Sequence, residues 1–248
     1  MNSGGGRRVR EDVGGRTVLA SPTAERVGFG WLMTTRLGWD DDPLADVARL
    51  RAACGGEWEG LAVGRQVHGV RVERVGTVKG LVRFPDTDGL VTSARGAALG
   101  VLTADCGVLA LWHPPSGALG LAHCGWRSVA GDIPGELLAS MAENFGAAPP
   151  DMYAVLSPCV CGRCYEVGTD VARAVESAAG TRTWRPLGGG KALLDLAAAV
   201  AARLARAGLP AGRMELPRLC TACDSALFHS WRRERSRGRM LTLVWRKD

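Results

Sequence analysis

A thiol and an imidazole stand at the ends of two apolar segments near the middle of the chain. Cys106 follows the run at residues 97–103, and His123 ends the run at residues 118–123. Short apolar runs bounded by Gly and Pro are typical of buried strands. The chain between the two residues is too long for a single turn, but two adjacent strands could bring the thiol and the imidazole together at one edge of a sheet.

The types of these side chains suit two kinds of catalysis. With His68 of the motif RQVHG, they form a set of imidazole and thiolate ligands that Zn²⁺ prefers, and three protein ligands leave the open position of a catalytic zinc. In the second chemistry, Cys106 is a nucleophile with His123 or His68 as its base. Asp105 would then orient the imidazole. An isolated buried Cys is most often a small core residue, and the spacing alone leaves all three interpretations open.

The remaining cysteines include two clusters. The motifs CVCGRC and CTAC contain Cys159, Cys161, Cys164, Cys220 and Cys223. Such clusters could hold a structural zinc or an iron–sulfur cluster, but a chain of 248 residues does not need a metal to fold. We therefore favour reduced thiols near the active cleft. Cys54 and Cys124 are assigned no chemical role, and Cys124 is expected to face the core.

The composition is typical of a globular protein of the cytoplasm. Hydrophobic residues make up 46% of the chain, yet no apolar run reaches the roughly 18 residues of a membrane span. The N-terminal residues are basic and lack the apolar segment of a secretory signal, and eight cysteines then indicate a reducing compartment. The net charge is +6, but the arginines are dispersed apart from a cluster at 230–239 and no nucleic-acid-binding module accompanies them. We expect neither a membrane nor a nucleic acid as a partner.

Hydrophobic periodicity and capping residues predict an α+β fold with helices packed on a mixed sheet. Asp42 and Thr169 are the predicted N-caps of two helices, and His113 is expected in a surface turn. The predicted helices cover residues 41–56, 128–145, 169–180 and 191–210. The predicted strands fall within residues 26–38, 61–75, 88–93, 97–103, 107–113, 118–123, 152–158 and 239–247. We predict one catalytic domain at residues 26–248, preceded by a disordered basic leader, rich in Gly and Arg, at residues 1–25.

Several motifs in unbroken order resemble one protein family. The segments are RQVHG, DGLVTSARGAALGVLTADCGVLALWHPPSGALGLAHCGWRS, SPCVCGRCYEVG, LLDLAAAVAARLARAGL and CTACDSALFHSWRRERSRGRM, with MTTRLG near the N-terminus. They closely resemble the YfiH-like family, once labelled multicopper polyphenol oxidases (laccase-domain proteins) and now described as purine nucleoside phosphorylases. The similarity covers about residues 26–246, and an ordered set of motifs is more specific than any single one.

The resemblance implies a fold, a metal and an activity. The fold is a single-domain, mixed-sheet α/β/β/α sandwich of the cysteine-hydrolase-like type, and the metal is zinc bound by His68, Cys106 and His123. The activities are phosphorolysis of adenosine, inosine, guanosine and methylthioadenosine, with purine nucleosides and phosphate as ligands, and hydrolytic deamination of adenosine.

Three alternatives to this function are open. The first is a cysteine-type amidase that edits cell-wall precursors. The second is a copper-dependent polyphenol oxidase, which the four His of the chain count against because several coppers need many His ligands. The third is a non-catalytic protein in which the metal only fixes a strand junction; a closed shell of four ligands would favour it.

Phosphorolysis needs an anion site, and the sequence offers several arginines. Arg127 would follow the ligand His123 at a strand-to-helix junction, where the helix N-terminus after Ser128 adds backbone donors. The weaker candidates are Arg36, Arg232 and Arg233.

Two polar residues beside the ligands complete the predicted site. Gln66 lies two residues before His68, hence on the same side of an expected strand, where it could hydrogen-bond the base or the ribose. Asp105 is expected to hydrogen-bond a ligating imidazole. The chain departs from the family pattern in the shortened loop WDDDP and at three positions near the motifs, which leaves the substrate preference open. These positions are Cys124, Ser128 and Ser157.

Overall fold

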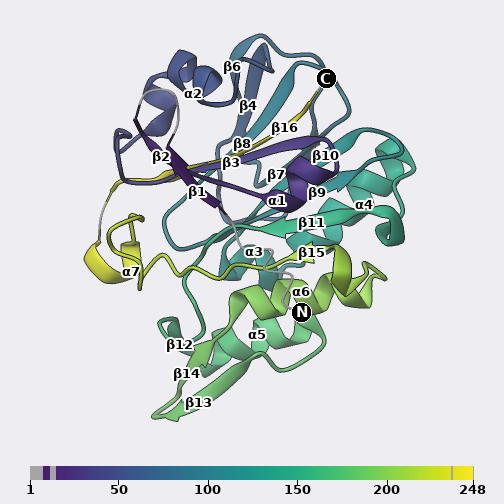
Figure 1. Ribbon diagram of the computed structural model, residues 1–248. Helices are drawn as coiled ribbons and strands as arrows, with labels where there is room; N and C mark the ends of the chain where they lie inside the picture. Colours follow the sequence, from purple (N-terminus) through teal and green to yellow (C-terminus); the bar gives the residue numbers. More distant parts are fainter. Residues whose placement is uncertain (1–7, 12–14, 236, 248) are drawn as a thin grey trace, which may run out of the picture.

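The computed structural model describes residues 8–11, 15–235 and 237–247, which form three β-sheets with helices packed on them (Figure 1). This arrangement confirms the prediction of a mixed α and β architecture with mixed sheets. Within these ranges no helix is both long and apolar enough to cross a lipid bilayer.

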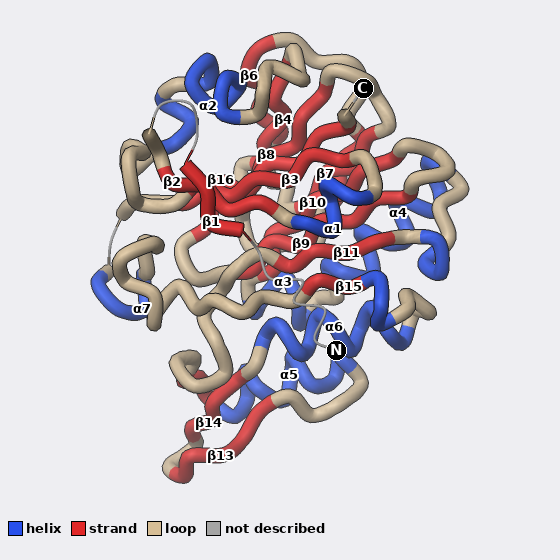
Figure 2. Tube along the Cα trace, in the orientation of Figure 1, coloured by secondary structure: helices blue, strands red, loops and turns tan. Residues whose placement is uncertain are grey.

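The two larger sheets each contain parallel and antiparallel strand pairs, and their strands are drawn in red in Figure 2. The seven-stranded sheet has the spatial order β1 (Arg8–Glu11), β2 (Thr17–Ala20), β3 (Phe29–Thr34), β16 (Met240–Arg246), β8 (Ala97–Thr103), β4 (Gly60–Gly64) and β6 (Gly80–Phe84). The six-stranded sheet has the order β15 (Met214–Glu215), β11 (Tyr153–Leu156), β9 (Gly107–His113), β10 (Ala118–Cys124), β7 (Gly89–Thr92) and β5 (Val72–Arg74). A small third sheet has the order β12 (Glu166–Gly168), β14 (Lys191–Leu194) and β13 (Trp184–Gly188).

Alternation along β9 sends successive apolar side chains into two different cores. In β9, Val108 and Trp112 pack in one core with Trp31 of β3, a strand of the other large sheet. Leu109 and Leu111 point the opposite way and pack with side chains of the helices. The two large sheets therefore lie face to face, and helices cover the outer face of the six-stranded sheet.

The helices are short and gather mainly on that outer face (Figure 1). They are α1 (Pro22–Arg26), α2 (Val47–Ala53), α3 (Trp126–Ala130), α4 (Ile133–Phe145), α5 (Thr169–Ala179), α6 (Leu196–Arg206) and α7 (Trp231–Glu234). Three single 3-10 turns lie at Pro43–Ala45, Pro149–Asp151 and Ala211–Arg213. The small third sheet extends away from the large sheets below α5 in this view (Figure 1).

Two predicted helices have different bounds in the structure. The segment 128–145 contains two helices, because Asp132 adopts a left-handed φ of 70° and its carboxylate accepts a hydrogen bond from the N–H of Gly135 at the start of α4. The segment 191–210 begins as strand β14, and α6 starts only after Asp195, whose carboxylate accepts from the N–H of Ala198. In both places a capping carboxylate fixes the helix start.

The predicted caps also shift by a few residues. Asp42 caps the 3-10 turn before α2, and Asp46 caps α2 itself. Gly168 occupies the N-cap position of α5, so Thr169 is the first residue of that helix. Strands β6, β12, β13 and β15 are additions to the predicted set.

The prediction that residues 1–25 form a disordered leader is wrong for part of that segment. Strands β1 and β2 pair with each other, and β2 also pairs with β3. Val18, Leu19 and Ala20 are buried, because the apolar sequence TVLA can extend the sheet. Residues 1–7 and 12–14 lie outside the described residues.

Three chain connections cross from the seven-stranded to the six-stranded sheet at one shared edge. Strands β4, β6 and β8 are parallel, so their C-terminal ends meet there. They continue into β5, β7 and β9, and the C-terminal end of β10 reaches the same edge because β10 runs antiparallel to both β7 and β9. The topology therefore gathers three loops and one strand end in a single place.

Candidate functional site

Three potential ligands converge at this edge. His68 lies between β4 and β5, Cys106 lies between β8 and β9, and His123 is the penultimate residue of β10. Their donor atoms all lie within 4.8 Å of one another, and the two imidazole rings meet edge to face with centroids 4.8 Å apart. The structure thus brings together the three side chains that the sequence analysis grouped.

The local hairpin explains the meeting of Cys106 and His123. In the antiparallel register of β9 and β10, His123 pairs with Val108 and Cys124 pairs with Gly107, so the residue before β9 lies beside the end of β10. Cys124 is fully buried in the core against the helices, as predicted, and alternation therefore points His123 the other way. His123 is buried, Cys106 is half-buried and His68 is exposed, so solvent reaches the group from the His68 side.

Asp88 holds the loop that presents His68. This residue precedes β7 and is 2% exposed. Its carboxylate accepts hydrogen bonds from the backbone N–H groups of Val67 (3.0 Å), His68 (3.0 Å) and Gly69 (2.8 Å). His68 has a left-handed φ of 61°, a conformation that costs a non-glycine residue of the order of 1 kcal/mol or more. The three hydrogen bonds offset this cost and fix the position of the imidazole.

The same carboxylate orients His123. Asp88 Oδ1 lies 2.8 Å from His123 Nδ1. An ionised carboxylate only accepts hydrogen bonds, so Nδ1 carries a proton and the neutral ring presents the lone pair of Nε2. Asp88 is the most important residue that the sequence analysis missed. The available signal was a single acidic residue at the start of the apolar run 88–93.

The pKa values of this group describe a thiolate beside an imidazolium. Burial alone would raise the pKa of Cys106, but hydrogen bonds from His123 and His68 and their positive charge lower it to about 6. Burial alone would lower the pKa of His123, but hydrogen bonds to Asp88 and Cys106 raise it to about 9. The pKa of Asp88 is lowered despite burial, through its hydrogen bonds to His123 and the loop N–H groups. Binding of a cation at His123 must therefore displace a proton.

Gly125 leaves free the space that the three donors face. A Cβ atom at this position would lie 2.8 Å from His68 Cδ2, 3.3 Å from Cys106 Sγ and 3.5 Å from His123 Cε1. An added Cβ would therefore collide with the His68 ring and press on Cys106 Sγ, while it would make an ordinary contact with His123. One thiolate, two imidazoles and a cradle kept open by glycine fit a single ion that retains one free position.

Asp105 does not hydrogen-bond an imidazole, contrary to the prediction. It is buried and has a left-handed φ of 91°. Its carboxylate accepts from Thr221 Oγ1 (2.7 Å) and from the backbone N–H of Arg232 (2.6 Å). Asp105 therefore ties the loop of Cys106 to Thr221, before α7, and to Arg232 in the first turn of α7. Asp88 has the orienting role.

Gln66 also differs from its prediction. Residues 65–71 form a loop, so the argument from strand alternation does not apply. The Gln66 amide donates to the Leu102 carbonyl (2.9 Å) and accepts from the Leu102 N–H (3.0 Å). Its hydrogen bonds are used to fasten the His68 loop to β8. His113, expected at the surface, is 6% exposed and hydrogen-bonds Ser116, because it is the last residue of β9.

The predicted arginines separate into two sets. Arg232 lies over the ring of Tyr165 at 5.2 Å, and Arg127 stacks on Trp126 at 4.4 Å. Burial raises the pKa of Tyr165, the negative charges of Cys106 and Asp105 raise it further, and the charges of Arg232 and Arg127 oppose this rise. Tyr165, which the sequence analysis missed, therefore shares its surroundings with Cys106 and both arginines.

The other two arginines have protein partners. Arg36 forms an ion pair with Glu234 (3.4 Å) and donates to the Ser225 carbonyl. Arg233 donates to three backbone carbonyls, those of Thr221, Ala222 and Phe228. These contacts fasten the segment around α7.

Comparison with known proteins places these features in a wider group. A family model described as multi-copper polyphenol oxidoreductase laccase matches residues 39–247. Purine nucleoside phosphorylase YlmD of Geobacillus stearothermophilus is 33% identical over 194 residues, which cover 74% of this chain and 71% of the relative. A purine nucleoside phosphorylase of Streptomyces coelicolor is 42% identical over 181 residues, which cover 73% and 72% of the two chains.

Solved structures are similar over almost the whole fold. The crystal structure of YlmD from Geobacillus stearothermophilus aligns with a TM-score of 0.85 at 27% identity and covers 97% of this chain and 99% of that one. The crystal structure of Bacillus licheniformis YfiH aligns with a TM-score of 0.81 at 23% identity, covers 93% and 96% of the two chains, and shows the same fold.

Proposed function

The chain belongs to the YfiH-like family of laccase-domain proteins, and we propose that it is a zinc-dependent purine nucleoside phosphorylase. Adenosine, inosine, guanosine and methylthioadenosine are the proposed nucleosides, with phosphate as the second substrate. Relatives named purine nucleoside phosphorylase support the reaction class. The single observation that carries the proposal is the convergence of His68, Cys106 and His123 within 4.8 Å of one another.

These three residues would hold the zinc. A thiolate and two imidazoles are donors that Zn²⁺ takes in protein sites with an open position, and Gly125 keeps the adjacent space clear. When bound, the ion would supply Lewis acidity to a water or a substrate oxygen. Asp88 would hold the His123 ring in the tautomer that presents Nε2. Three donors rather than four favour a catalytic over a purely structural role.

Arg127 and Arg232 are the proposed phosphate ligands. Both are exposed, and both act on Tyr165 close to Cys106. Guanidinium groups bind phosphate through charge-assisted hydrogen bonds. Arg36 and Arg233 are left out of the proposed anion site because their guanidinium groups already have protein partners. Arg36 pairs with the carboxylate of Glu234, and Arg233 donates to backbone carbonyls.

The reaction sets the tasks of the remaining residues. In phosphorolysis, a phosphate oxygen bonds to the ribose C1′ while the bond from C1′ to the purine nitrogen breaks, and the purine leaves with the electron pair. The departing base then needs a hydrogen-bond donor. Burial keeps the pKa of Tyr165 above its ordinary value, so its phenol retains the proton at neutral pH and can donate to the base.

Two further activities are proposed at the same centre. One is deamination of adenosine, in which water adds to the purine carbon and ammonia leaves. The other is the alternative function of a cysteine-type amidase, which a specific observation favours: Cys106, His123 and Asp88 are arranged as a nucleophile, a base and an orienting carboxylate, and the pKa of Cys106 is lowered to about 6. A content of eight cysteines suits a reducing compartment such as the cytoplasm.

The deciding experiment combines metal analysis with a nucleoside assay. Purified protein is incubated with inosine, with and without phosphate, and hypoxanthine release is measured. We expect phosphate-dependent release that H68A and C106A abolish, while C54A, which removes a buried thiol outside this group, retains it. Absence of hypoxanthine release, together with hydrolysis of an amide substrate that survives chelation but is lost on thiol alkylation, would favour the amidase. Phenol oxidation by a copper-loaded protein would overturn the zinc assignment.

A further inference from the structure

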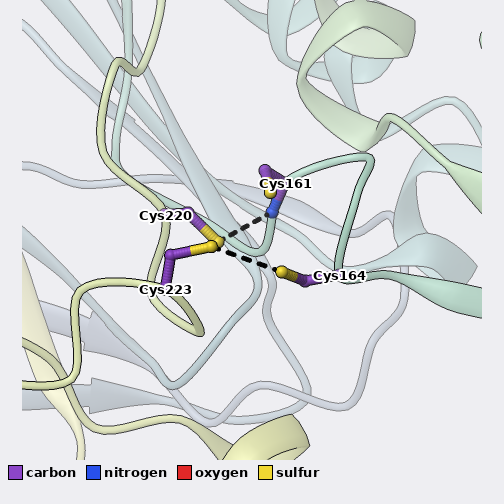
Figure 3. A group of neighbouring side chains, drawn as sticks. All are labelled: Cys161, Cys164, Cys220 and Cys223. Atoms are coloured by element: carbon purple, nitrogen blue, oxygen red, sulfur yellow. Dashed lines mark hydrogen bonds between the residues drawn. The ribbon is translucent and has the colours of Figure 1, made fainter.

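We propose that Cys161, Cys164, Cys220 and Cys223 form a second metal site, distinct from the His68 centre, which binds one zinc ion through four thiolates. The four sulfur atoms lie within 4.8 Å of one another. Figure 3 shows that two of the side chains come from the loop after β11 and two from the segment before α7, and that the pairs face each other. Two C-x-x-C motifs far apart in sequence therefore meet in space.

The distances suit a single tetrahedral ion. Thiolates about 2.3 Å from one zinc ion in a tetrahedron lie about 3.8 Å from one another. The sulfurs of Cys164 and Cys223 are 3.4 Å apart, and the whole group fits within the 4.8 Å limit. An iron–sulfur cluster places several irons and sulfides between its ligands and needs a wider group. A disulfide between Cys164 and Cys223 would leave the other two sulfurs without a function.

The backbone of both motifs is folded as metal-binding turns require. Cys164 N–H donates to the Cys161 carbonyl at 2.9 Å, and Asp224 N–H donates to the Cys220 carbonyl at 2.9 Å. The Cys161 N–H donates to Cys220 Sγ at 3.2 Å, a bond that stabilises a thiolate and reaches from one motif to the other. These hydrogen bonds hold the sulfurs in a group without help from a cation.

Charge also favours a cation here. Four sulfur donors that face one another at this distance are a ligand set that zinc prefers. The charge of Arg163 interacts with Cys161 but supplies only one positive charge. A divalent ion contacts all four sulfurs at once. Cys159 does not belong to the group: its backbone pairs with Cys220 in an isolated bridge, and the thiol is buried.

The site would connect two segments that form a wall of the His68 centre. Tyr165 directly follows Cys164, and Thr221 directly follows Cys220. Thr221 donates to Asp105, the residue before Cys106. An ion on the four cysteines would therefore hold Tyr165 and the Cys106 loop in register, although no ligand is shared between the two sites.

The test counts zinc in the H68A background, which removes an exposed ligand of the first centre. Protein is purified under reducing conditions without chelators, and zinc is measured by elemental analysis. We expect one zinc per chain in H68A and none in H68A/C223S. The matched control H68A/C159A changes a thiol of the same loop outside the group and should retain one zinc. Cobalt substitution of H68A should give the strong thiolate-to-cobalt absorption of a four-sulfur site.

A separate measurement keeps the test valid if C223S fails to fold. An organomercurial reagent, which binds thiolates, is added to folded H68A, and zinc release is followed with a chromogenic chelator; release of one equivalent supports the site. The proposal is overturned if H68A contains no zinc, if it contains iron instead, or if mass spectrometry finds a Cys164–Cys223 disulfide in its place. Because the first centre is disabled throughout, these outcomes do not depend on the proposed catalytic function.

Discussion

Replacing Asp88 with asparagine should weaken metal binding at the His68 centre without changing its ligands. The Asp88 carboxylate accepts four hydrogen bonds: two at Oδ2, from Val67 and Gly69, and two at Oδ1, from His68 and His123. An asparagine has one accepting oxygen and one donating nitrogen. The amide must therefore place its nitrogen on one side of this network.

The free energy of the hydrogen bonds lost in each orientation decides which way the amide of the D88N variant turns. With nitrogen at the Oδ2 position, two backbone donors of the loop lose their acceptor, at about 1–3 kcal/mol each. With nitrogen at the Oδ1 position, only the His68 N–H loses its acceptor, and the amide donates to His123 Nδ1. The second orientation is preferred, so D88N should lower the free energy of unfolding by about 1–3 kcal/mol.

The preferred orientation reverses the tautomer of His123. A proton moves to Nε2, the atom that faces Cys106, and metal binding must first return it to Nδ1 against the amide donor. We expect zinc affinity to fall about 10- to 100-fold, as for other lost partners of ligating histidines.

Zinc affinity is measured by competition with a chromogenic chelator in the C223S background, so that only one class of site contributes. Urea unfolding is followed in parallel. D86N is the matched control, because Asp86 lies in the same connection but is exposed and hydrogen-bonds Arg65 rather than the His68 loop N–H groups. If D88N is folded and binds zinc as tightly as the parent protein, Asp88 does not set the tautomer, and the reasoning is refuted.

Four further predictions test other parts of the structure. G125A should reduce zinc at the His68 centre at least tenfold, because the added Cβ lies 2.8 Å from the His68 ring; elemental analysis checks this. In metal-free protein, the rate of Cys106 alkylation by iodoacetamide, followed by mass spectrometry, should be half-maximal near pH 6, because the pKa of the thiol is lowered to about 6. The contribution of this thiolate to the stability of the folded state is then complete above the unfolded pKa of 9.0 and is lost as the pH falls through about 6. D132A should lower the free energy of unfolding in urea by about 2 kcal/mol, because it removes the cap of α4 and the ion pair with Arg203 (2.7 Å). Chelation should abolish phosphorolysis, and added zinc should restore it.

Each of these predictions has an opposing result. Full zinc content in G125A would show that the ion lies away from the glycine. Half-maximal alkylation of Cys106 near pH 9 would show that the imidazoles do not stabilise its thiolate. Unchanged stability of D132A would assign the split between α3 and α4 to packing alone, and activity after complete chelation would exclude a metal-dependent reaction.

Cys106 and His123 were predictable as ligands because the residue type and the apolar run before each of them can be recognised in the sequence alone. Cys106 and His123 end apolar runs, and the hairpin between them follows from the turn that separates the runs. The partner of His123 was not predictable in the same way. Asp88 reaches the site through the parallel crossovers between the sheets, and only the strand order reveals that its loop meets those of His68 and Cys106.

Errors in the sequence analysis came from residues whose role depends on distant backbone. Strand alternation predicts that Gln66 hydrogen-bonds the base or the ribose, yet its side-chain amide hydrogen-bonds the backbone of Leu102. Leu193 continues the helical pattern of 191–210, but strand pairing with β12 and β13 overrides helix propensity up to Asp195. The leader was misassigned because its charged residues hide a short apolar strand, Thr17–Ala20, which has a place only once β3 is present.

The connections that cross between the two large sheets at their shared edge link the stability of the fold to metal binding at the His68 centre. Each of the three donors is carried by a different part of the junction between the two large sheets, so an occupied centre would resist any sliding of one layer over the other. The melting temperature should therefore rise with free zinc concentration, as mass action requires for a ligand of the folded state. Substitutions at Trp31 or Trp112, which lie in the core between the two large sheets and are not ligands, should lower the affinity for the ion by letting the sheets shift.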